Sequence, residues 1–121
     1  NAIVGTIDIM PTLLDLAGVP IPTGIAGRSF KNEIINPQNE TNFDVLFSQN
    51  QFGRMVRYDD FKYVRSIVYG ITYEILYDLK NDPLESTNLV NDNKYRDPLD
   101  RGRKLLDDWL KTENTVLVTK K

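Results

Sequence analysis

The sequence predicts an α+β fold in which an antiparallel sheet of three or four strands packs against a C-terminal helix, preceded by an N-terminal helix and a long loop. Three observations support this prediction. Short runs rich in β-branched and aromatic residues occupy the middle of the chain. Apolar residues recur at helical spacing in the last third. Between an early helical segment and the strands lies VPIPTGIAGRSF, whose two Pro and two Gly are typical of an irregular connection.

The N-terminal helix is predicted over 12–17, after a short strand end. Pro11 suits the first helical turn because proline needs no N–H partner there. Gly18 suits the position just past the helix end, where a left-handed backbone is common. The residues that follow, 19–42, are predicted to be mostly loop.

The predicted strands are the four runs VLFSQ, RMVRY, FKYVRSIVY and YEILYDL. Asp59-Asp60 suits a tight hairpin turn between the second and third runs, and Gly70 marks the turn before the fourth. In the fourth run every second residue is apolar, which indicates one apolar face of the sheet. That face would consist of Tyr73, Ile75, Tyr77 and Leu79.

The C-terminal helix is predicted to begin in RDPLD, where Asp97 suits the N-cap, Pro98 the first helical position and Asp100 the third. An apolar stripe follows, formed by Leu99, Leu106, Trp109 and Leu110, with Leu105 at its edge. Gly102 lies on the same side, and we expect it to allow a close approach to the sheet. The final TVLVTKK is predicted to be a short strand or a frayed tail.

Composition excludes several classes of function. The chain has 121 residues, enough for one compact domain, and a net charge of −2 with no basic block, which argues against a nucleic-acid partner. It contains no Cys and no His. Thiol nucleophiles, disulfides, thiolate or imidazole metal sites and the usual base of a serine triad are therefore excluded. No apolar run approaches the roughly 20 residues of a membrane span.

Four oxygen-bearing side chains fall within eleven residues and raise the question of a cation site: Asp78, Asp82, Glu85 and Asn88. A calcium loop would need more oxygen ligands at alternating spacing and a Gly for its sharp turn. Asp82-Pro83-Leu84-Glu85 instead has the spacing of a capping box, in which Asp82 and Glu85 each accept a hydrogen bond from the other's N–H. Asp97 and Asp100 repeat this spacing. We therefore predict that Asp82, Glu85, Asp97 and Asp100 are structural caps, and we assign no metal site.

Other charged residues allow both a functional and a structural interpretation. Asp8 could ligate a metal, but it is predicted to cap the turn before Pro11. Asp59 and Asp60 would perform acid–base chemistry only in a desolvated pocket, whereas a hairpin turn leaves them solvated. Arg28, after a Gly-rich loop, is a weak anion-binding candidate. Cations along two paired strands could contact an anionic ligand or simply line a solvated face: Arg54, Arg57, Lys62 and Arg65.

Three segments, in this order and spacing, resemble the sulfatase family. VGTIDIMPTLLDLAGVPIPTGIAGRSF is similar to a stretch in which a V-D-x-x-P-T-L-L-D-L-A-G helix leads into P-x-x-x-x-G-R-S-L. RMVRYDDFKYV resembles the family's R-x-V-R-x-x-x-x-K-Y segment, and LYDLKNDPLESTNL resembles its L-Y-D-L-x-x-D-P-x-E-x-x-N-L signature. The resemblance covers about residues 3–112, and its first segment is shared in looser form by the alkaline-phosphatase superfamily.

The resemblance implies that 1–42 is the tail end of a catalytic domain and that 43–121 is a C-terminal subdomain. Sulfatases hydrolyse sulfate esters, often on sugars, with a calcium ion and a formylglycine made from Cys or Ser. Both belong to an N-terminal domain, and the chain lacks the C/S-x-P-x-R motif, so no catalytic or metal residue is assigned here. The subdomain closes one side of the substrate cleft, which by position makes Gln49, Gln51, Arg54 and, more weakly, Arg28 candidates for substrate contact.

We therefore expect an inactive C-terminal portion of a sulfatase, whose partners are a sulfated small molecule or glycan and the N-terminal catalytic domain. The chain begins within an element, without initiator Met or signal peptide, in keeping with a longer protein. The resemblance favours a periplasmic or secreted location. Without the catalytic domain, the apolar face of the helix at 11–17 is expected to mediate self-association. The alternatives are a stand-alone binding module, a pseudoenzyme, or part of a phosphodiesterase or phosphonate hydrolase of the same superfamily.

Overall fold

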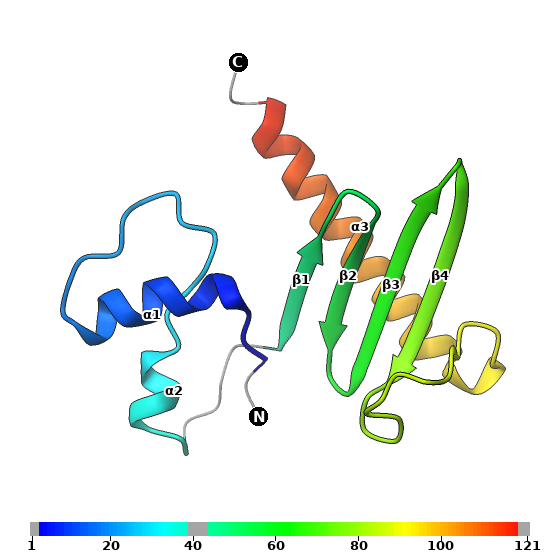
Figure 1. Ribbon diagram of the computed structural model, residues 1–121, viewed down its shortest axis with the longest axis horizontal. Helices are drawn as coiled ribbons and strands as arrows, with labels where there is room; N and C mark the ends of the chain where they lie inside the picture. The colour runs from blue at the N-terminus through cyan, green and yellow to red at the C-terminus, as the bar shows by residue number, and fades with distance from the viewer. Residues whose placement is uncertain (1–2, 39–43, 119–121) are drawn as a thin grey trace. The chain divides into compact units, whose positions relative to one another are not determined.

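The computed structural model describes residues 3–38 and 44–118, with side chains described to Thr112 (Figure 1). The chain divides into two compact units, 1–46 and 47–121. It therefore does not form the one compact domain that its length would allow. The N-terminal unit is helical, and the C-terminal unit holds most of an antiparallel sheet together with a long helix. The α+β class, the antiparallel sheet and both helices predicted from the sequence are confirmed.

The N-terminal unit contains the short 3-10 helix η1 (Thr6–Asp8), α1 (Ile9–Leu16) and α2 (Lys31–Ile35). Helix α1 begins three residues earlier than the sequence predicts, and the predicted strand end does not form in residues 3–5. The sequence did not indicate α2, because five residues are too few to display helical periodicity in a polar stretch.

Helix α1 ends in the geometry that the sequence predicts. Gly18 has φ of 70°, a left-handed conformation that glycine adopts without steric cost. The Gly18 N–H donates to the Asp15 carbonyl at 3.1 Å, and the Val19 N–H donates to the Leu14 carbonyl at 2.9 Å. This pair of bonds is the Schellman motif, and it satisfies carbonyls that the helix end would otherwise leave without partners.

The connection after α1 folds back along the helix through side-chain hydrogen bonds. Thr12 accepts from the Phe30 N–H at 3.1 Å, and Asp15 accepts from the Ser29 hydroxyl at 2.6 Å. Lys31 also pairs with Asp15 at 3.1 Å. Residues 29–31, which lead into α2, are therefore held against α1 by its polar side chains.

The sheet has the strand order β1-β2-β3-β4, formed by Val45–Gln49, Gly53–Tyr58, Phe61–Val68 and Ile71–Asp78. Both predicted hairpin turns are confirmed. Tyr58 pairs with Phe61 across a two-residue turn that opens with Asp59 at φ of 47°. Val68 pairs with Ile71 across Tyr69-Gly70, where both turn residues have positive φ, as a type I′ turn requires.

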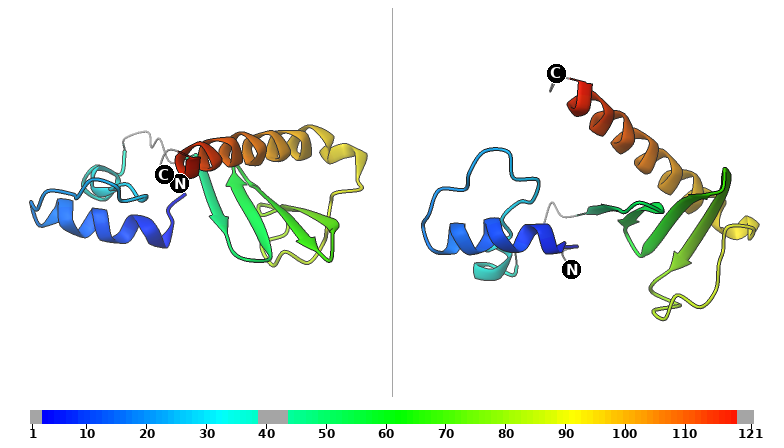
Figure 2. Two further views of the ribbon diagram at one scale, coloured as in Figure 1. Left: turned by 90° about the horizontal axis from the view of Figure 1, so that it is seen from above. Right: turned by 45° about the horizontal axis from the view of Figure 1, so that its top comes forward.

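Helix α3 (Arg96–Val118) lies along one face of the sheet (Figure 2). The closest approach is at Gly102, which is buried. A Cβ at this position would lie 2.7 Å from the Tyr58 hydroxyl oxygen and 2.9 Å from the Tyr63 Cβ, so only glycine fits without displacement. This confirms the role predicted for Gly102. The buried apolar core comprises Val56, Tyr58, Tyr63, Leu76, Leu99 and Leu106.

The sheet face that packs against α3 is not the one that the sequence pattern indicates. Leu76 is fully buried and Asp78 is 6% exposed, whereas Tyr73, on the predicted apolar face, is 51% exposed. The reason is that the buried face of β4 also carries two charged residues: Glu74 is bound by Arg103 of α3, and Asp78 is bound by the turn that directly follows the strand. Alternation of apolar residues therefore pointed to the wrong face of this strand.

Helix α3 also begins differently from the prediction. A 3-10 helix, η2 (Asn93–Tyr95), precedes it, and the Asp92 side chain caps η2 by accepting from the Lys94 N–H at 3.0 Å. Asp97 is the second residue of α3 rather than its N-cap, and Asp100 forms an ion pair with Arg103 at 3.2 Å. Residues 115–118 continue the helix, so no separate strand forms there, and 119–121 lie outside the described residues.

The outer edge of β4 is covered by the segment that follows it. The Asn88 side chain accepts from the Leu76 N–H at 3.1 Å and donates to the Glu74 carbonyl at 3.1 Å. The Leu89 N–H donates to the Leu76 carbonyl at 2.9 Å.

No helix in the described part of the chain has the length and hydrophobicity that crossing a bilayer requires.

The packing at Gly102 predicts that Gly102→Ala lowers the free energy of unfolding by about 1–3 kcal/mol, because the added methyl group would collide with Tyr58 and Tyr63. This reverses the usual gain from replacing glycine within a helix. Urea unfolding measures the effect, and Lys104→Ala on the exposed side of α3 is the control, expected to change stability by less than about 0.5 kcal/mol. Equal or greater stability of Gly102→Ala would contradict the close approach.

Candidate functional site

A hollow open to solvent lies at the turn between β1 and β2, with a volume of about 150 Å³. Its polar lining comes from Ser48, Gln49, Asn50, Arg54 and Ser66, and its apolar lining comes from Phe52, Met55 and Val64, with Gly53 between. Most of these residues come from β1, β2 and the turn that connects them, and β3 contributes Val64 and Ser66. The hollow combines several neutral polar groups and one aromatic ring.

The turn that forms the rim of this hollow is held by Asn50. Its side-chain oxygen accepts from the N–H groups of Phe52 and Gly53, both at 2.9 Å, and the Asn50 N–H donates to the Gly53 carbonyl at 2.9 Å. A Cβ on Gly53 would lie 2.6 Å from the Ser66 hydroxyl oxygen, so glycine lets the turn approach β3 closely. Phe52 is held at the rim with 63% of its surface exposed.

Arg54 stands directly opposite Arg65 in the pairing of β2 with β3. Like charges in this position repel each other unless counter-charges neutralise them. Arg65 has such a partner, because its guanidinium forms an ion pair with Asp107 at 2.6 Å and its Nε donates to the Tyr63 hydroxyl at 3.0 Å. No carboxylate in the described part of the chain forms an ion pair with Arg54.

The Nε atom of Arg54 is buried and has no hydrogen-bond partner among the described residues. A buried donor left in this state costs roughly 1–3 kcal/mol, and more when it carries charge. Guanidinium groups bind sulfate, phosphate and carboxylate through two parallel hydrogen bonds. No base that could activate a nucleophile is among the residues that line the hollow.

The structure places the predicted substrate-contact residues differently. Gln49 and Arg54 line the hollow, and Gln51 is exposed in the same turn without lining it. Arg28 belongs to the N-terminal unit, where its backbone N–H donates to Asp8 at 2.9 Å. Substrate contact by any of these four stays a prediction. Sequence reasoning did not single out Asn50, Phe52 and Ser66, although an Asn three residues before a Gly is a signal for a side-chain-stabilised turn.

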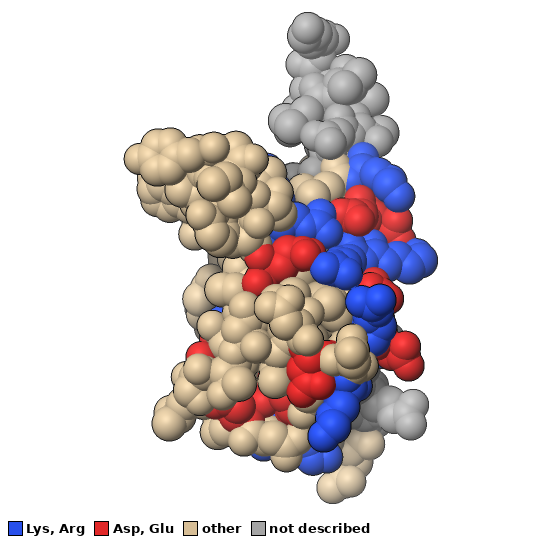
Figure 3. Space-filling model, turned by 90° about the vertical axis from the view of Figure 1, so that its right-hand side faces the viewer, with Lys and Arg blue, Asp and Glu red and all other residues tan. Residues whose placement is uncertain are grey.

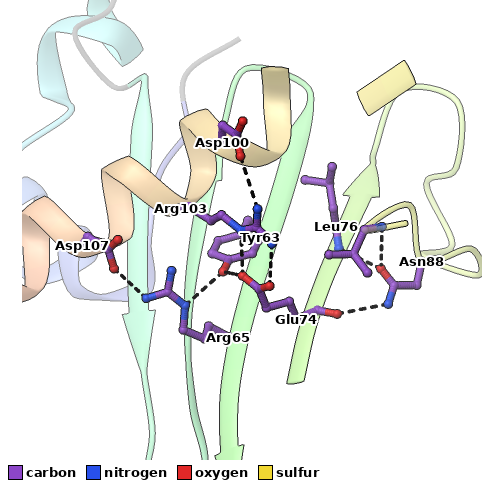
Figure 4. A network of polar contacts seen from close by, with 9 residues as sticks. Tyr63, Arg65, Glu74, Leu76, Asn88, Asp100, Arg103 and Asp107 are labelled. Carbon is purple, nitrogen blue, oxygen red and sulfur yellow. Dashed lines mark hydrogen bonds and ion pairs between the residues drawn. The ribbon is translucent and has the colours of Figure 1, made fainter. Parts of the chain in front are cut away.

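A network of polar contacts lies between the sheet and α3, beside the hollow's strands (Figure 4). Glu74 receives two hydrogen bonds from Arg103, at 2.9 and 2.6 Å, and a third from the Tyr63 hydroxyl. Arg65 joins the network through Tyr63 and links it to Asp107 on α3. The network holds the side chain of Arg65, the residue of β3 that is paired with Arg54.

These contacts shift the acid–base equilibrium of Glu74. The hydrogen bonds from Arg103 hold its pKa at about 2, against an ordinary value of 4.5, although burial acts in the opposite direction. The same contact raises the pKa of Arg103. Because Glu74 is ionised and paired throughout the neutral range, we assign it to positioning rather than proton transfer.

The acidic stretch after β4 is a turn, and the predicted capping box does not form. No helix follows Asp82, whose carboxylate accepts from the Ser86 hydroxyl at 2.9 Å and the Thr87 N–H at 2.8 Å. Glu85 has φ of 54° and pairs with Lys62 at 2.6 Å instead of reaching the Asp82 N–H. Asp78 is occupied by the N–H groups of Lys80 and Asn81, each at 3.1 Å.

The remaining acidic candidates also have structural partners. Asp8 is 4% exposed and accepts from the Gly5 N–H at 2.8 Å as well as from the Arg28 N–H, so it closes a turn as the sequence predicts. Asp59 lies in the hairpin turn and pairs with Arg101 of α3. No group of three or more acidic residues in the described part of the chain is arranged to hold a metal ion.

Acidic and basic side chains are interspersed on the face of the molecule shown in Figure 3. Along α3, Asp108 pairs with Lys104 at 2.5 Å and with Lys111 at 2.9 Å. This face carries no extended field of one sign of the kind that draws polyanions non-specifically.

Residues 1–111 match the model of the N-sulphoglucosamine sulphohydrolase C-terminal family. The chain belongs to this family, and therefore to the sulfatases. Among curated proteins it is 35% identical over 113 residues to the Δ4,5-hexuronate-2-O-sulfatase of Bacteroides thetaiotaomicron, covering 87% of the chain and 23% of that protein. It is also 35% identical over 105 residues to an arylsulfatase of Clostridium perfringens, covering 82% of the chain and 21% of that protein.

Solved structures show the same relationship. A 2-O GAG sulfatase superposes with a TM-score of 0.73 at 34% identity, covering 94% of this chain and 26% of that one. A second structure, solved in complex with its substrate D-glucosamine-2-N,6-O-disulfate, superposes with a TM-score of 0.71 at 26% identity, covering 86% and 23%. The family resemblance predicted from the sequence is confirmed. The chain spans between about a fifth and a quarter of the length of the curated relatives it matches.

The position of Glu74 predicts a specific acid sensitivity. Because its pKa falls on folding from 4.5 to about 2, its stabilising contribution is complete above about pH 4.5 and disappears as the pH falls through about 2. We expect Glu74→Gln to destabilise the protein at pH 7 and to flatten the pH dependence of urea unfolding between these values. Asp100→Asn, which alters the more exposed partner of Arg103, is the control. An unchanged pH profile in Glu74→Gln would contradict this assignment.

Proposed function

We propose that this chain is the C-terminal portion of a sulfatase that hydrolyses sulfuric esters of carbohydrates, and that it helps to shape the substrate cleft. The observation that carries the proposal is the family match over residues 1–111. The named relatives support a carbohydrate substrate, since one is a hexuronate sulfatase and another was solved with a disulfated glucosamine.

The contribution of this chain is proposed to be recognition rather than hydrolysis. The hollow beside β1 and β2 offers neutral polar groups and an exposed aromatic ring, which are groups suited to binding a sugar. Its rim is fixed by the Asn50 hydrogen bonds, so little conformational entropy would be lost on binding. Gln49 and Arg54 are the proposed contacts in this unit, and Arg28 is the proposed contact in the N-terminal unit.

The calcium ion and the formylglycine that the resemblance implies are proposed to belong to the remainder of the enzyme. The described residues hold no group of three or more acids arranged to bind a metal ion, and the sequence lacks the C/S-x-P-x-R motif in which a formylglycine would form. No step of hydrolysis is therefore assigned to a residue of this chain. The proposed partner of the chain is the N-terminal catalytic domain.

Activity measurements test this proposal. The full-length protein encoded by the same reading frame is expected to hydrolyse an aryl sulfate and a sulfated disaccharide, whereas the 121-residue chain alone is expected to hydrolyse neither. Replacing the Cys or Ser of the C/S-x-P-x-R motif in the full-length protein serves as the inactive control. Turnover by the isolated chain would overturn the division of roles, and a preference for phosphate or phosphonate esters would overturn the sulfatase assignment.

Helix α1 predicts how the isolated chain behaves in solution. Its exposed apolar residues, Ile9, Met10, Leu13 and Leu16, are proposed to mediate self-association when the catalytic domain is absent. We expect light scattering to detect oligomers at high concentration, and the double variant Met10→Glu, Leu13→Glu to shift them toward monomer. Ile34→Glu, at an exposed apolar position on α2, is the matched control. A strict monomer for the unmodified chain would contradict this expectation.

A further inference from the structure

We propose that one face of the β3–β4 hairpin packs against the part of the enzyme that lies outside this chain, and that this contact fixes the C-terminal unit beside the substrate cleft. This inference rests on the proposed function, which makes the chain the C-terminal portion of a longer protein, and it deepens that proposal by naming the contact surface. The surface, called the hairpin surface below, consists of apolar residues near the end of the sheet: Val68, Ile71, Tyr73 and Ile75, with Tyr69 at the tip of the hairpin.

The strand register places the hairpin surface on the sheet face opposite α3. Tyr63 and Leu76 are paired with each other and are both buried under the helix. Because side chains alternate between the two faces along a strand, Ile75 points away from α3, as do the other strand residues of the hairpin surface. Figure 2 shows α3 along one face of the sheet, and in the described part of the C-terminal unit no helix lies over the other face.

The hairpin surface has the composition of a buried face. In an antiparallel sheet with one face in water, the side chains on that face are normally polar. Here Ile71 and Tyr73 are 57% and 51% exposed, and no residue of the hairpin surface carries a charge. The apolar alternation predicted for β4 runs along this same face, and burial by a further layer of protein would explain it. Exposed apolar patches of this kind mark sites of protein contact.

The tip of the hairpin supports the same inference. Tyr69 is 100% exposed and has φ of 51° at the first central position of a type I′ turn, where Asn, Asp or Gly is preferred. A bulky side chain is uncommon in this left-handed conformation, so chain reversal alone does not account for a tyrosine here. Its ring, of a type enriched in protein interfaces, projects beyond the end of the sheet.

The length of the related proteins indicates what covers the hairpin surface. The chain matches a C-terminal family model and covers 26% of the 2-O GAG sulfatase, so about three quarters of that relative lies outside the match. A body of this size can bury the whole hairpin surface. Ile75 is paired with Val64, which lines the hollow, so the two features adjoin. The contact would therefore place the hollow at the edge of a domain interface, where ligand sites commonly occur.

The test measures whether the hairpin surface is covered in the full-length protein. Ile71→Cys and Tyr69→Cys are each treated with a maleimide, and peptide mass spectrometry quantifies modification at these positions separately from any other thiol. Leu84→Cys is the matched control, because Leu84 is also apolar and is 87% exposed in the turn after β4. Each rate is divided by the rate in urea, which removes differences in intrinsic thiol reactivity.

We expect both hairpin positions to react at least about 10-fold more slowly in the folded protein than in urea, because the contact must open before the thiol can react. The control is expected to react within about twofold of its rate in urea. Labelling of either hairpin position at the rate of the control would overturn the proposal.

Two further measurements distinguish other occupants of the hairpin surface. Protection that disappears on dilution would assign the surface to a second copy of the protein, and protection that appears only with a sulfated disaccharide would assign it to the substrate. Either result overturns the proposal. Because labelling requires no turnover, a full-length protein that hydrolyses no sulfate ester would contradict the proposed function, while the labelling rates would still decide whether the hairpin surface is covered.

Discussion

The close approach of α3 to the sheet at Gly102 is the constraint on which the C-terminal unit depends. Because Gly102 presents no side chain, Tyr58 and Tyr63 can lie against the helix backbone, and the Tyr58 hydroxyl reaches the Pro98 carbonyl at 2.5 Å. Burial raises the pKa of Tyr58 to about 12, so it remains a donor at any physiological pH. The next residue, Arg103, is thereby placed over Glu74, and Leu99 and Leu106 extend the contact one turn on either side.

The polar network follows from this packing and explains an unusual core. The face of β4 that is covered by α3 carries Glu74 and Asp78, which would destabilise the fold if they lacked partners. Arg103 neutralises the first, and backbone N–H groups of the following turn surround the second. The network also orients Arg65, and so the helix contact and the charge environment of Arg54 belong to one connected set of interactions.

The features that were predicted correctly from the sequence are those that local rules of backbone conformation and spacing determine. The hairpin turn at Asp59-Asp60, the helix end at Gly18 and the function of Gly102 depend on backbone conformation or local spacing, and each can be derived from the residue itself. The buried face of β4 could not be derived in this way, because the partner of Glu74 lies 29 positions later in the chain. The supposed capping box failed for the same reason, since Glu85 pairs with Lys62 on a distant strand. At the candidate site, Arg54 could be proposed from its position in the chain, but its place opposite Arg65 became known only from the strand register.

The covered edge of β4 has a consequence for how the molecule meets others of its kind. An open edge strand presents unpaired N–H and C=O groups to which a foreign strand can add, and this is a common route to amyloid-like assembly. Here Asn88 and Leu89 occupy the groups of Leu76 and the carbonyl of Glu74, in the middle of the strand. A second molecule could not extend the sheet along this edge without first displacing the turn. The end of the LYDLKNDPLESTNL segment therefore blocks the addition of a strand at this edge of the sheet.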